Sequence, residues 1–223
     1  MKQGIVGIMK PKNTPPHFWV LFQSLLKALL TSQIFLLAML NPVYANQLKN
    51  HSSPYLALHG NDPVNWMEWG KPALDKARKE NKLLLVSVGY FACHWCHVMQ
   101  RESYSDKGIA NKLNKNYVSV KVDRELNPVL DKRLIEFVSV TNGSAGWPLN
   151  VFITPEGYPL VGATYLPRKN FSDVLDRLNN KWKTEQASLS KQAKEMSQTL
   201  VTMLEKQERI VEGNIKDLSA KYV

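Results

Sequence analysis

Cysteine is scarce in this chain: its 223 residues contain two cysteines, Cys93 and Cys96. A disulfide between residues so close in sequence closes a very small loop and constrains little of the unfolded chain. The sequence is therefore not that of a small domain held together by disulfides. Because both thiols lie in the pentapeptide Cys93-His94-Trp95-Cys96-His97, we expect the pair to be present for its reactivity rather than for stability.

Acidic residues are absent from the first 45 positions, which carry four lysines. An apolar run at 28–40 follows Lys27, and Val43-Tyr44-Ala45 has the small or apolar residues that a signal peptidase reads. We expect residues 1–45 to be a signal peptide cleaved after Ala45, and the mature protein to be periplasmic or secreted. In such a compartment a close cysteine pair is oxidised unless another molecule reduces it.

A long uninterrupted apolar run is also missing, since 28–40 is shorter than the roughly 20 residues that span a bilayer. Extending the run back to Phe18 gives a spanning stretch interrupted by Lys27. An uncleaved inner-membrane anchor is therefore the alternative to a signal peptide.

The chain lacks the pattern of a nucleic-acid-binding module, although its formal net charge is +10. After residue 45 its lysines are mixed with acidic residues, as at 191–195 and 205–209. That mixture is typical of a solvated helix face rather than a basic stripe, so we expect no nucleic-acid partner.

After residue 45, the spacing of apolar residues predicts alternating helices and strands. The polar, turn-rich segment 46–62 is expected to be extended. The predicted elements are a helix at 66–81, a strand at 83–88, a helix beginning at Cys93, a short helix at 105–113, a strand at 117–123, a helix at 127–140, two strands at 149–154 and 158–164, and a helix from Phe171 almost to the end.

This order predicts an α/β fold with a mixed central sheet flanked by helices, because strands alternating with helices imply a parallel core and the last two strands form a hairpin. We divide the chain into residues 46–182, which form this domain, and 183–223, which form a helical C-terminal extension. Cys93 directly follows a central strand, and sites in α/β sheets lie at the carboxyl ends of strands.

The chemistry predicted for the pair follows from its position at the start of a helix. Unpaired backbone N–H groups and the helix dipole favour a thiolate there, so thiol pKa values in such Cys-x-x-Cys motifs are lowered. We assign Cys93 as the attacking nucleophile and Cys96, one turn inward, as the residue that resolves the mixed disulfide. His94, if protonated, would stabilise the thiolate of Cys93; the alternative is an exposed residue without that role.

A second interpretation of the pentapeptide is that Cys-x-x-Cys-His attaches a c-type haem, with His97 as an axial ligand. The buried strand and the α/β order disfavour it, because small c-type cytochromes are loop-rich helical proteins. A zinc site using both cysteines and His94 or His97 would have poor geometry, since adjacent helical positions point in different directions. We therefore predict no metal and no cofactor, and we expect His97 to be a partly buried helix residue.

Trp147-Pro148 is the second motif, because a proline directly before a strand can carry a cis peptide bond. A Cys-x-x-Cys helix after one strand and an X-Pro bond before a hairpin are similar to the thioredoxin order. That resemblance implies that the Trp147-Pro148 loop lies beside the sulfurs, where its backbone pairs with an extended substrate peptide. Trp95 would offer the substrate a flat apolar surface, or else packs against its own domain.

The resemblance extends to one family. The whole set is similar to the thioredoxin-like domain of the family typified by spermatogenesis-associated protein 20, over about residues 46–167. Relatives carry a large α/α-barrel domain after this one, which we expect to be lacking here because the chain ends at Val223. The motifs, which occur together and in order, are Ser53-Pro-Tyr-Leu56, Asn61-Asp-Pro-Val-Asn-Trp66, Cys93-His-Trp-Cys-His-Val-Met99, Arg101-Glu-Ser103, Val120-Lys-Val-Asp-Arg-Glu125 and Gly146-Trp-Pro-Leu-Asn-Val151.

One departure from ordinary thioredoxins concerns the proton of the inner cysteine. Thioredoxins have a buried carboxylate on the strand before the motif, and by spacing Ser87 takes that place here. Asp123, at the end of the next strand, is the nearest alternative proton acceptor, unless it only caps the turn at 124–125. Losing the carboxylate would slow proton removal from Cys96.

These observations predict an exported thiol–disulfide oxidoreductase that exchanges the Cys93–Cys96 pair with protein substrates and with an unidentified redox partner. The alternatives are a c-type haem-binding electron carrier and a thioredoxin-fold domain that binds without catalysis. In the C-terminal helix, the apolar spacing predicts either packing back onto the domain or weak self-association. The residues at this spacing are Leu189, Ala193, Met196, Leu200 and Met203.

Overall fold

The structure, a computed structural model, describes the backbone of residues 46–222 and the side chains of residues 46–206. The signal peptide expected at residues 1–45 lies outside the described residues. Within the described part, no helix combines the length and apolar character that a membrane span requires.

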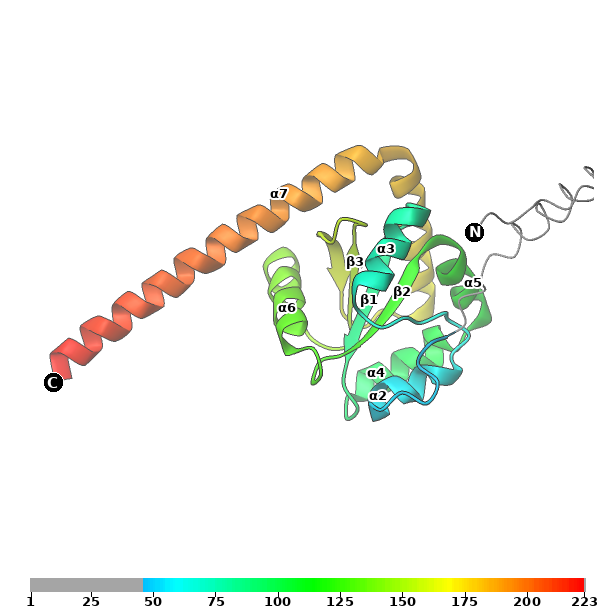
Figure 1. Cartoon of the computed structure of the whole chain (residues 1–223), viewed down its shortest axis with the longest axis horizontal. Helices are drawn as coiled ribbons and strands as arrows, with labels where there is room; N and C mark the ends of the chain where they lie inside the picture. The colour runs from blue at the N-terminus through cyan, green and yellow to red at the C-terminus, as the bar shows by residue number, and fades with distance from the viewer. Residues whose placement is uncertain (1–45, 223) are drawn as a thin grey trace, which may run out of the picture. The chain divides into compact units, whose positions relative to one another are not determined.

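A four-stranded mixed sheet forms the centre of the domain, as predicted (Figure 1). Its order is β2 (Val118–Asp123), β1 (Leu84–Gly89), β3 (Leu149–Ile153) and β4 (Pro159–Ala163). β1 pairs in parallel with β2 and antiparallel with β3, and β4 completes the antiparallel hairpin. β1 is buried along its whole length, which agrees with its mostly apolar sequence.

Helices cover both faces of this sheet. One face carries the apolar cluster that contains Cys96 and Tyr55, and the other carries a cluster that contains Val86, Leu134 and Phe137. The helices are α2 (Pro54–Leu58), η1 (His59–Asn61), α3 (Lys71–Glu80), α4 (His94–Met99), η2 (Gln100–Tyr104), α5 (Lys107–Asn116), α6 (Pro128–Asn142) and α7 (Arg168–Tyr222).

The prediction of an extended segment at 46–62 is wrong, because α2 and η1 form there. Ser53 caps α2 by accepting a hydrogen bond from the Leu56 backbone N–H at 3.2 Å, and Pro54 suits the first turn of a helix. The polar, turn-like composition of the segment concealed this cap. The helix brings Tyr55 into the core beside Cys96.

The helix predicted from Trp66 begins later, at Lys71. The chain before it is extended, and the Met67 N–H donates to the Ser119 carbonyl of β2 at 2.9 Å. Trp66 is fully buried there, so its apolar character reflects the core rather than a helix face. Pro72 lies in the first turn of α3, where the missing backbone donor costs nothing.

α7 contributes to both clusters. Its first turns pack Phe171 and Leu175 into the cluster of Cys96, and Leu200 reaches the opposite cluster. The helix is interrupted between these regions at Glu185, whose φ of −128° and ψ of 21° are not helical. This kink lets one continuous segment follow the domain from one face of the sheet to the other.

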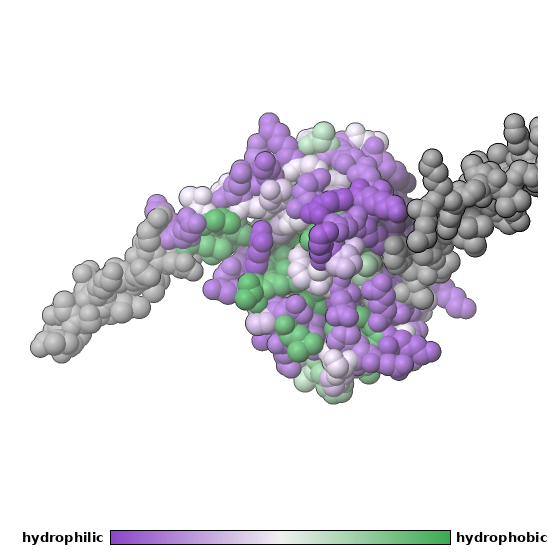
Figure 2. Space-filling model, viewed as in Figure 1, coloured by the Kyte–Doolittle hydropathy of each residue, from purple (hydrophilic) through white to green (hydrophobic). Residues whose placement is uncertain are grey.

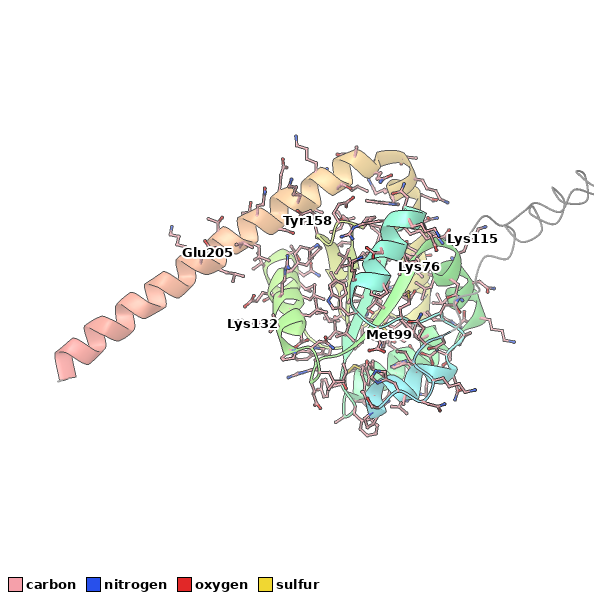
Figure 3. All side chains as sticks on the ribbon, viewed as in Figure 1. Lys76, Met99, Lys115, Lys132, Tyr158 and Glu205 are labelled. Atoms are coloured by element: carbon pink, nitrogen blue, oxygen red, sulfur yellow. A yellow bond between two sulfur atoms is a disulfide. The ribbon has the colours of Figure 1, made fainter. Side chains whose placement is uncertain are left out.

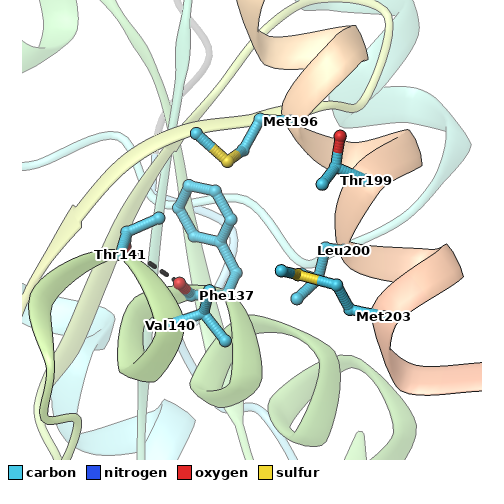
Figure 4. A pocket seen from close by; sticks show the side chains of 7 residues that line it. All are labelled: Phe137, Val140, Thr141, Met196, Thr199, Leu200 and Met203. Atoms are coloured by element: carbon cyan, nitrogen blue, oxygen red, sulfur yellow. Dashed lines mark hydrogen bonds between the residues drawn. The ribbon is translucent and has the colours of Figure 1, made fainter. Parts of the chain in front are cut away.

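The later part of α7 packs against α6 (Figure 4). Met196, Leu200 and Met203 face Phe137 and Val140 across a shallow apolar pocket, and Leu200 is buried there. Figure 2 shows apolar side chains among hydrophilic ones on the face where α6 and α7 lie. The predicted helical seam therefore contacts its own domain, and weak self-association through this helix stays a prediction.

Candidate active site

Cys93 and Cys96 form a disulfide at the start of α4, with their Cα atoms 5.3 Å apart. Cys93 is the N-cap of this helix, and its Sγ accepts a hydrogen bond from the Cys96 backbone N–H at 3.3 Å. Both cysteines are buried, with Cys93 4% and Cys96 1% exposed. The helix start therefore provides the backbone donor that a sulfur at this position needs to carry negative charge.

The pair lies at the carboxyl end of β1, next to the loop before β3. In the antiparallel pairing of these strands Val88 lies opposite Leu149, which places Pro148 beside Gly89. The Trp147–Pro148 peptide bond is cis. The proline loop thus lies at the same end of β1 as the turn that leads to the cysteines.

Three neighbours hold the indole of Trp147 in place. Its Nε1 donates to Asp131 Oδ1 at 2.8 Å, and the guanidinium of Arg124 lies 4.1 Å from its ring centroid. The ring of Tyr90 meets it edge-on at 5.9 Å, and the Tyr90 carbonyl accepts the Cys93 N–H. These contacts connect the proline loop to the turn that carries the cysteines, so the two parts are positioned together.

Exposed aromatic side chains surround this end of the molecule. Phe91 is 54% and Trp95 is 52% exposed. The ring of Trp95 also contacts Tyr165, with centroids 4.9 Å apart, and the Tyr165 hydroxyl donates to Glu102. Trp95 therefore combines both alternatives considered for it: it packs against the domain on one side and presents apolar surface on the other.

The two histidines of the pentapeptide differ in their surroundings. His94 is exposed and meets the ring of Trp95 edge-on. His97 is half-buried on the second turn, and its Nε2 lies 2.7 Å from the Phe91 carbonyl, which confirms the prediction of a partly buried helix residue. The role of His94 in tuning Cys93 stays a prediction.

A buried polar layer lies on the same face of the sheet, beneath α4 and η2. The Tyr104 hydroxyl lies 2.9 Å from Ser87 Oγ and 2.6 Å from Asn150 Oδ1. The sulfur of Met99, which is labelled in Figure 3, accepts from both Tyr104 and Asn150. Ser87 occupies the strand position at which thioredoxins have a carboxylate, and its hydroxyl contacts Tyr104 and Lys121 there.

Lys121 is a basic residue buried within this layer, at 1% exposure. Its Nζ donates to Ser87 Oγ at 2.9 Å and lies 4.4 Å from the ring centroid of Tyr104 and 5.2 Å from that of Trp66. Burial lowers the pKa of Lys121 to about 7, against the opposing charge of Asp62. The ammonium is thus held by aromatic faces and one hydroxyl, without a direct carboxylate partner among the described contacts.

Asp123, the predicted proton acceptor, is also buried. Its Oδ2 accepts from Ser53 Oγ at 2.6 Å, and its Oδ1 accepts from the Glu125 backbone N–H at 3.0 Å. The second contact is the turn cap considered from the sequence, and the first joins β2 to the start of α2. Both oxygens thus already hold hydrogen bonds in the disulfide form, and the role of Asp123 as a proton acceptor stays a prediction.

A buried His–Asp pair lies next to this polar layer. His59 Nδ1 lies 2.7 Å from Asp62 Oδ2, which also accepts from Trp66 Nε1 at 3.0 Å. Burial lowers the pKa of His59 to about 4 despite this carboxylate, so the imidazole is neutral at pH 7. The pair therefore fixes the η1 segment beside Trp66 as a hydrogen-bonded unit.

Sequence reasoning missed Tyr55 and Lys121. Lys121 alternates with Val120 and Val122, a pattern that normally indicates a strand with one solvated face. Here α2 covers that face, so all six residues of β2 are buried. The signal available in the sequence was the motif Ser53-Pro-Tyr-Leu56, whose serine and proline are a helix start.

Gly89 sits where the site leaves no room for a side chain. A methyl group built on Gly89 would overlap Tyr55 Oη and would lie 2.7 Å from Cys96 Sγ. We expect Gly89→Ala to lower the free energy of unfolding by about 1–3 kcal/mol, because both neighbours are buried and packed. Chemical denaturation of the oxidised protein measures this.

The matched control for Gly89→Ala is Gly146→Ala, at the nearby loop, where an added methyl group has no neighbour within 4 Å. Equal losses of stability for the two variants would contradict the close packing around Gly89.

Among the described residues, no group of three or more His, Cys, Asp or Glu side chains could hold a metal ion. The site as described consists of a disulfide, a proline loop and a buried polar layer.

Residues 45–201 match the family model Thioredox_DsbH, described as "Protein of unknown function, DUF255". Spermatogenesis-associated protein 20 of Rattus norvegicus is 44% identical over 167 residues, which cover 72% of this chain and 21% of the rat protein. The human protein of that name is 43% identical over 166 residues, covering 72% and 21%. The chain thus spans about a fifth of the length of these relatives.

Solved structures also align with the chain. The structure of "DsbH Oxidoreductase" aligns with a TM-score of 0.40 and 21% identity, over 50% of this chain and 81% of that chain. A thioredoxin from Thermus thermophilus aligns with a TM-score of 0.43 and 20% identity, over 53% and 89%.

Proposed function

Because the chain belongs to the thioredoxin-like DsbH family (DUF255), we propose that it is a thiol–disulfide oxidoreductase that exchanges the Cys93–Cys96 pair with cysteines of protein substrates. The observation that carries the proposal is the Cys93–Cys96 disulfide at a helix start, next to the loop with the cis Trp147–Pro148 bond. Cys93 attacks a substrate sulfur or is attacked by one, and Cys96 closes the ring again.

The surface around the disulfide supports a peptide as the substrate. Trp147 lies in the loop directly before β3, and an extended peptide can pair with the backbone of such a loop by strand addition. Phe91 and Trp95 are half exposed beside it and offer apolar contacts to the substrate side chains. The proposal further includes export to an oxidising compartment, where an unidentified redox partner resets the pair.

The decisive experiment is a redox titration of the Cys93–Cys96 pair in glutathione buffers, combined with an insulin-reduction assay. We expect the pair to be reduced and reoxidised reversibly as one two-electron couple. If the protein stays folded but the pair does not titrate reversibly, the exchange function is refuted. The remaining hypothesis is then a domain that binds without catalysis.

A further inference from the structure

The hydroxyl of Tyr55 is buried and has no hydrogen-bond partner in the part of the chain whose side chains are described. Tyr55 itself is 1% exposed. Buried hydroxyls are almost always hydrogen-bonded, and an unpaired one costs free energy that an apolar side chain of the same shape would not. An unpaired Tyr55 hydroxyl in the core therefore requires an explanation.

This hydroxyl lies in the same small region as the inner sulfur. Oη of Tyr55 and Sγ of Cys96 both lie within 2.7 Å of the vacant Cβ position of Gly89, so the two groups are near neighbours. Tyr55 and Cys96 belong to the same apolar cluster, under α2 and α4. The absence of a side chain at Gly89 thus lets the two groups approach each other at the end of β1.

The surroundings keep Tyr55 protonated. Burial raises the pKa of Tyr55 well above its ordinary value, and Tyr104 of η2, Asp123 of β2 and Asp62 after η1 raise it further. Lys121 of β2 faces the ring at 5.4 Å, and the His59 ring meets it edge-on at 5.2 Å. Tyr55 is therefore protonated at neutral pH and can donate a hydrogen bond there.

Opening the Cys93–Cys96 disulfide leaves Cys96 with a free thiol or thiolate beside this hydroxyl. A disulfide sulfur is a weak acceptor, whereas a thiolate is a charged and strong one. We propose that Tyr55 is a catalytic residue whose hydroxyl donates a hydrogen bond to Cys96 Sγ when the Cys93–Cys96 bond is open. This inference rests on the proposed function, and it gives Tyr55 the role of stabilising the Cys96 thiolate rather than accepting the Cys96 proton.

The step that Tyr55 assists is the resolution of the mixed disulfide. Cys96 loses its proton, and its thiolate, held by the Tyr55 hydroxyl, attacks Cys93 Sγ. The bond between Cys93 and the substrate sulfur breaks as the Cys93–Cys96 bond forms. The substrate sulfur takes the electron pair of the broken bond and a proton, so it leaves as a thiol and the proton count is unchanged. Tyr55 keeps its own proton throughout.

The test uses the full chain with Cys93→Ser, in which Cys96 is a free thiol, and follows thiolate absorbance against pH. We expect Tyr55→Phe in this background to lower the acid dissociation constant of Cys96 about tenfold, which raises its pKa by about one unit. In the chain with both cysteines, we expect the same substitution to prolong the mixed disulfide with glutathione about tenfold.

The matched control is Tyr117→Phe. Tyr117 is a buried tyrosine of the same cluster, but its hydroxyl donates to the Leu175 carbonyl at 2.5 Å. The Tyr117→Phe substitution should leave the Cys96 pKa unchanged. A structural role for the Tyr55 hydroxyl predicts lost stability in Tyr55→Phe, whereas we expect its stability to be unchanged or higher.

The outcomes separate the two proposals. If the wild-type pair titrates reversibly but Tyr55→Phe leaves the Cys96 pKa and the lifetime of the mixed disulfide unchanged, the Tyr55 assignment is wrong and the proposed function stands. If the wild-type pair does not titrate reversibly, the proposed function fails, and Tyr55 has no reaction to assist.

Discussion

Replacing Cys93 by serine is expected to lower the rate of insulin reduction to the uncatalysed background. Replacing Cys96 by serine should instead trap a covalent complex with the substrate. Cys93 caps α4 and its sulfur accepts the backbone N–H of Cys96, a position that favours a thiolate at the attacking residue. Without Cys96 the mixed disulfide that Cys93 forms has no internal thiol to resolve it. Non-reducing electrophoresis and intact-mass measurement detect the complex.

Both single variants should remain folded, so differences in their reactions with the substrate reflect the missing thiol. The disulfide joins residues three apart, so it constrains little of the unfolded chain and contributes little entropic stabilisation. Thermal unfolding of the two variants is therefore expected to resemble that of the reduced wild-type protein. A covalent complex formed by Cys93→Ser instead of Cys96→Ser would reverse the assignment of nucleophile and resolving residue.

The parts of the site that local sequence specifies were predictable. The strand 83–88 is apolar apart from Ser87, and Cys93 opens a helix shortly after it. The place of Cys93 near the end of a buried strand therefore followed from pattern alone. Trp147-Pro148 directly precedes a strand, where a cis bond is possible, and the resemblance to thioredoxins pointed to the cis bond that the structure shows.

The buried polar layer was not predictable, because it depends on which element covers each face of the sheet. Ser119, Lys121 and Asp123 alternate with valines and have the pattern of a solvated strand face. α2 covers this face instead, through the capping residue Ser53, which hydrogen-bonds to Asp123. A short helix in a polar segment thus turned an apparently exposed lysine into a buried one and brought Tyr55 to Cys96.

The α6–α7 contact was predictable only as one of two outcomes. Ala193 and Leu200 follow helical spacing, which indicates an apolar seam but not what covers it. The kink at Glu185 turns α7 so that this seam meets Phe137 of α6. A break in helical geometry without proline or glycine leaves no plain signal in the sequence.

Lys121→Met is expected to stabilise the protein near pH 7 and to remove a rise in stability with pH. Burial lowers the pKa of Lys121 to about 7, compared with the ordinary value of 10.5 that applies in the unfolded chain. Between these values the unfolded chain binds one more proton than the folded chain. Stability contributed by this group therefore rises with pH through this window, by up to about 1.4 kcal/mol per pH unit.

Below pH 7 both states carry the charge, and the folded state bears the full cost of burying it, which the aromatic rings and Asp62 only partly offset. Methionine has a similar length and no charge, and Ser87 keeps its hydrogen bond with Tyr104 when the ammonium is removed. The difference in unfolding free energy between Lys121→Met and wild type should hence be largest at pH 7 and below, and shrink as pH rises toward 10.

Urea denaturation of wild type and Lys121→Met at several pH values from 6 to 9.5 measures this difference, and titrations shared by both proteins cancel in it. Lys132→Met is the control, because Lys132 is exposed on α6 and pairs loosely with Glu136, with 3.8 Å between Nζ and Oε1. Its stability should follow that of wild type at every pH to within about 0.5 kcal/mol. Parallel curves for Lys121→Met and wild type would mean that Lys121 keeps an ordinary pKa in the fold, and that its aromatic neighbours compensate fully for its burial.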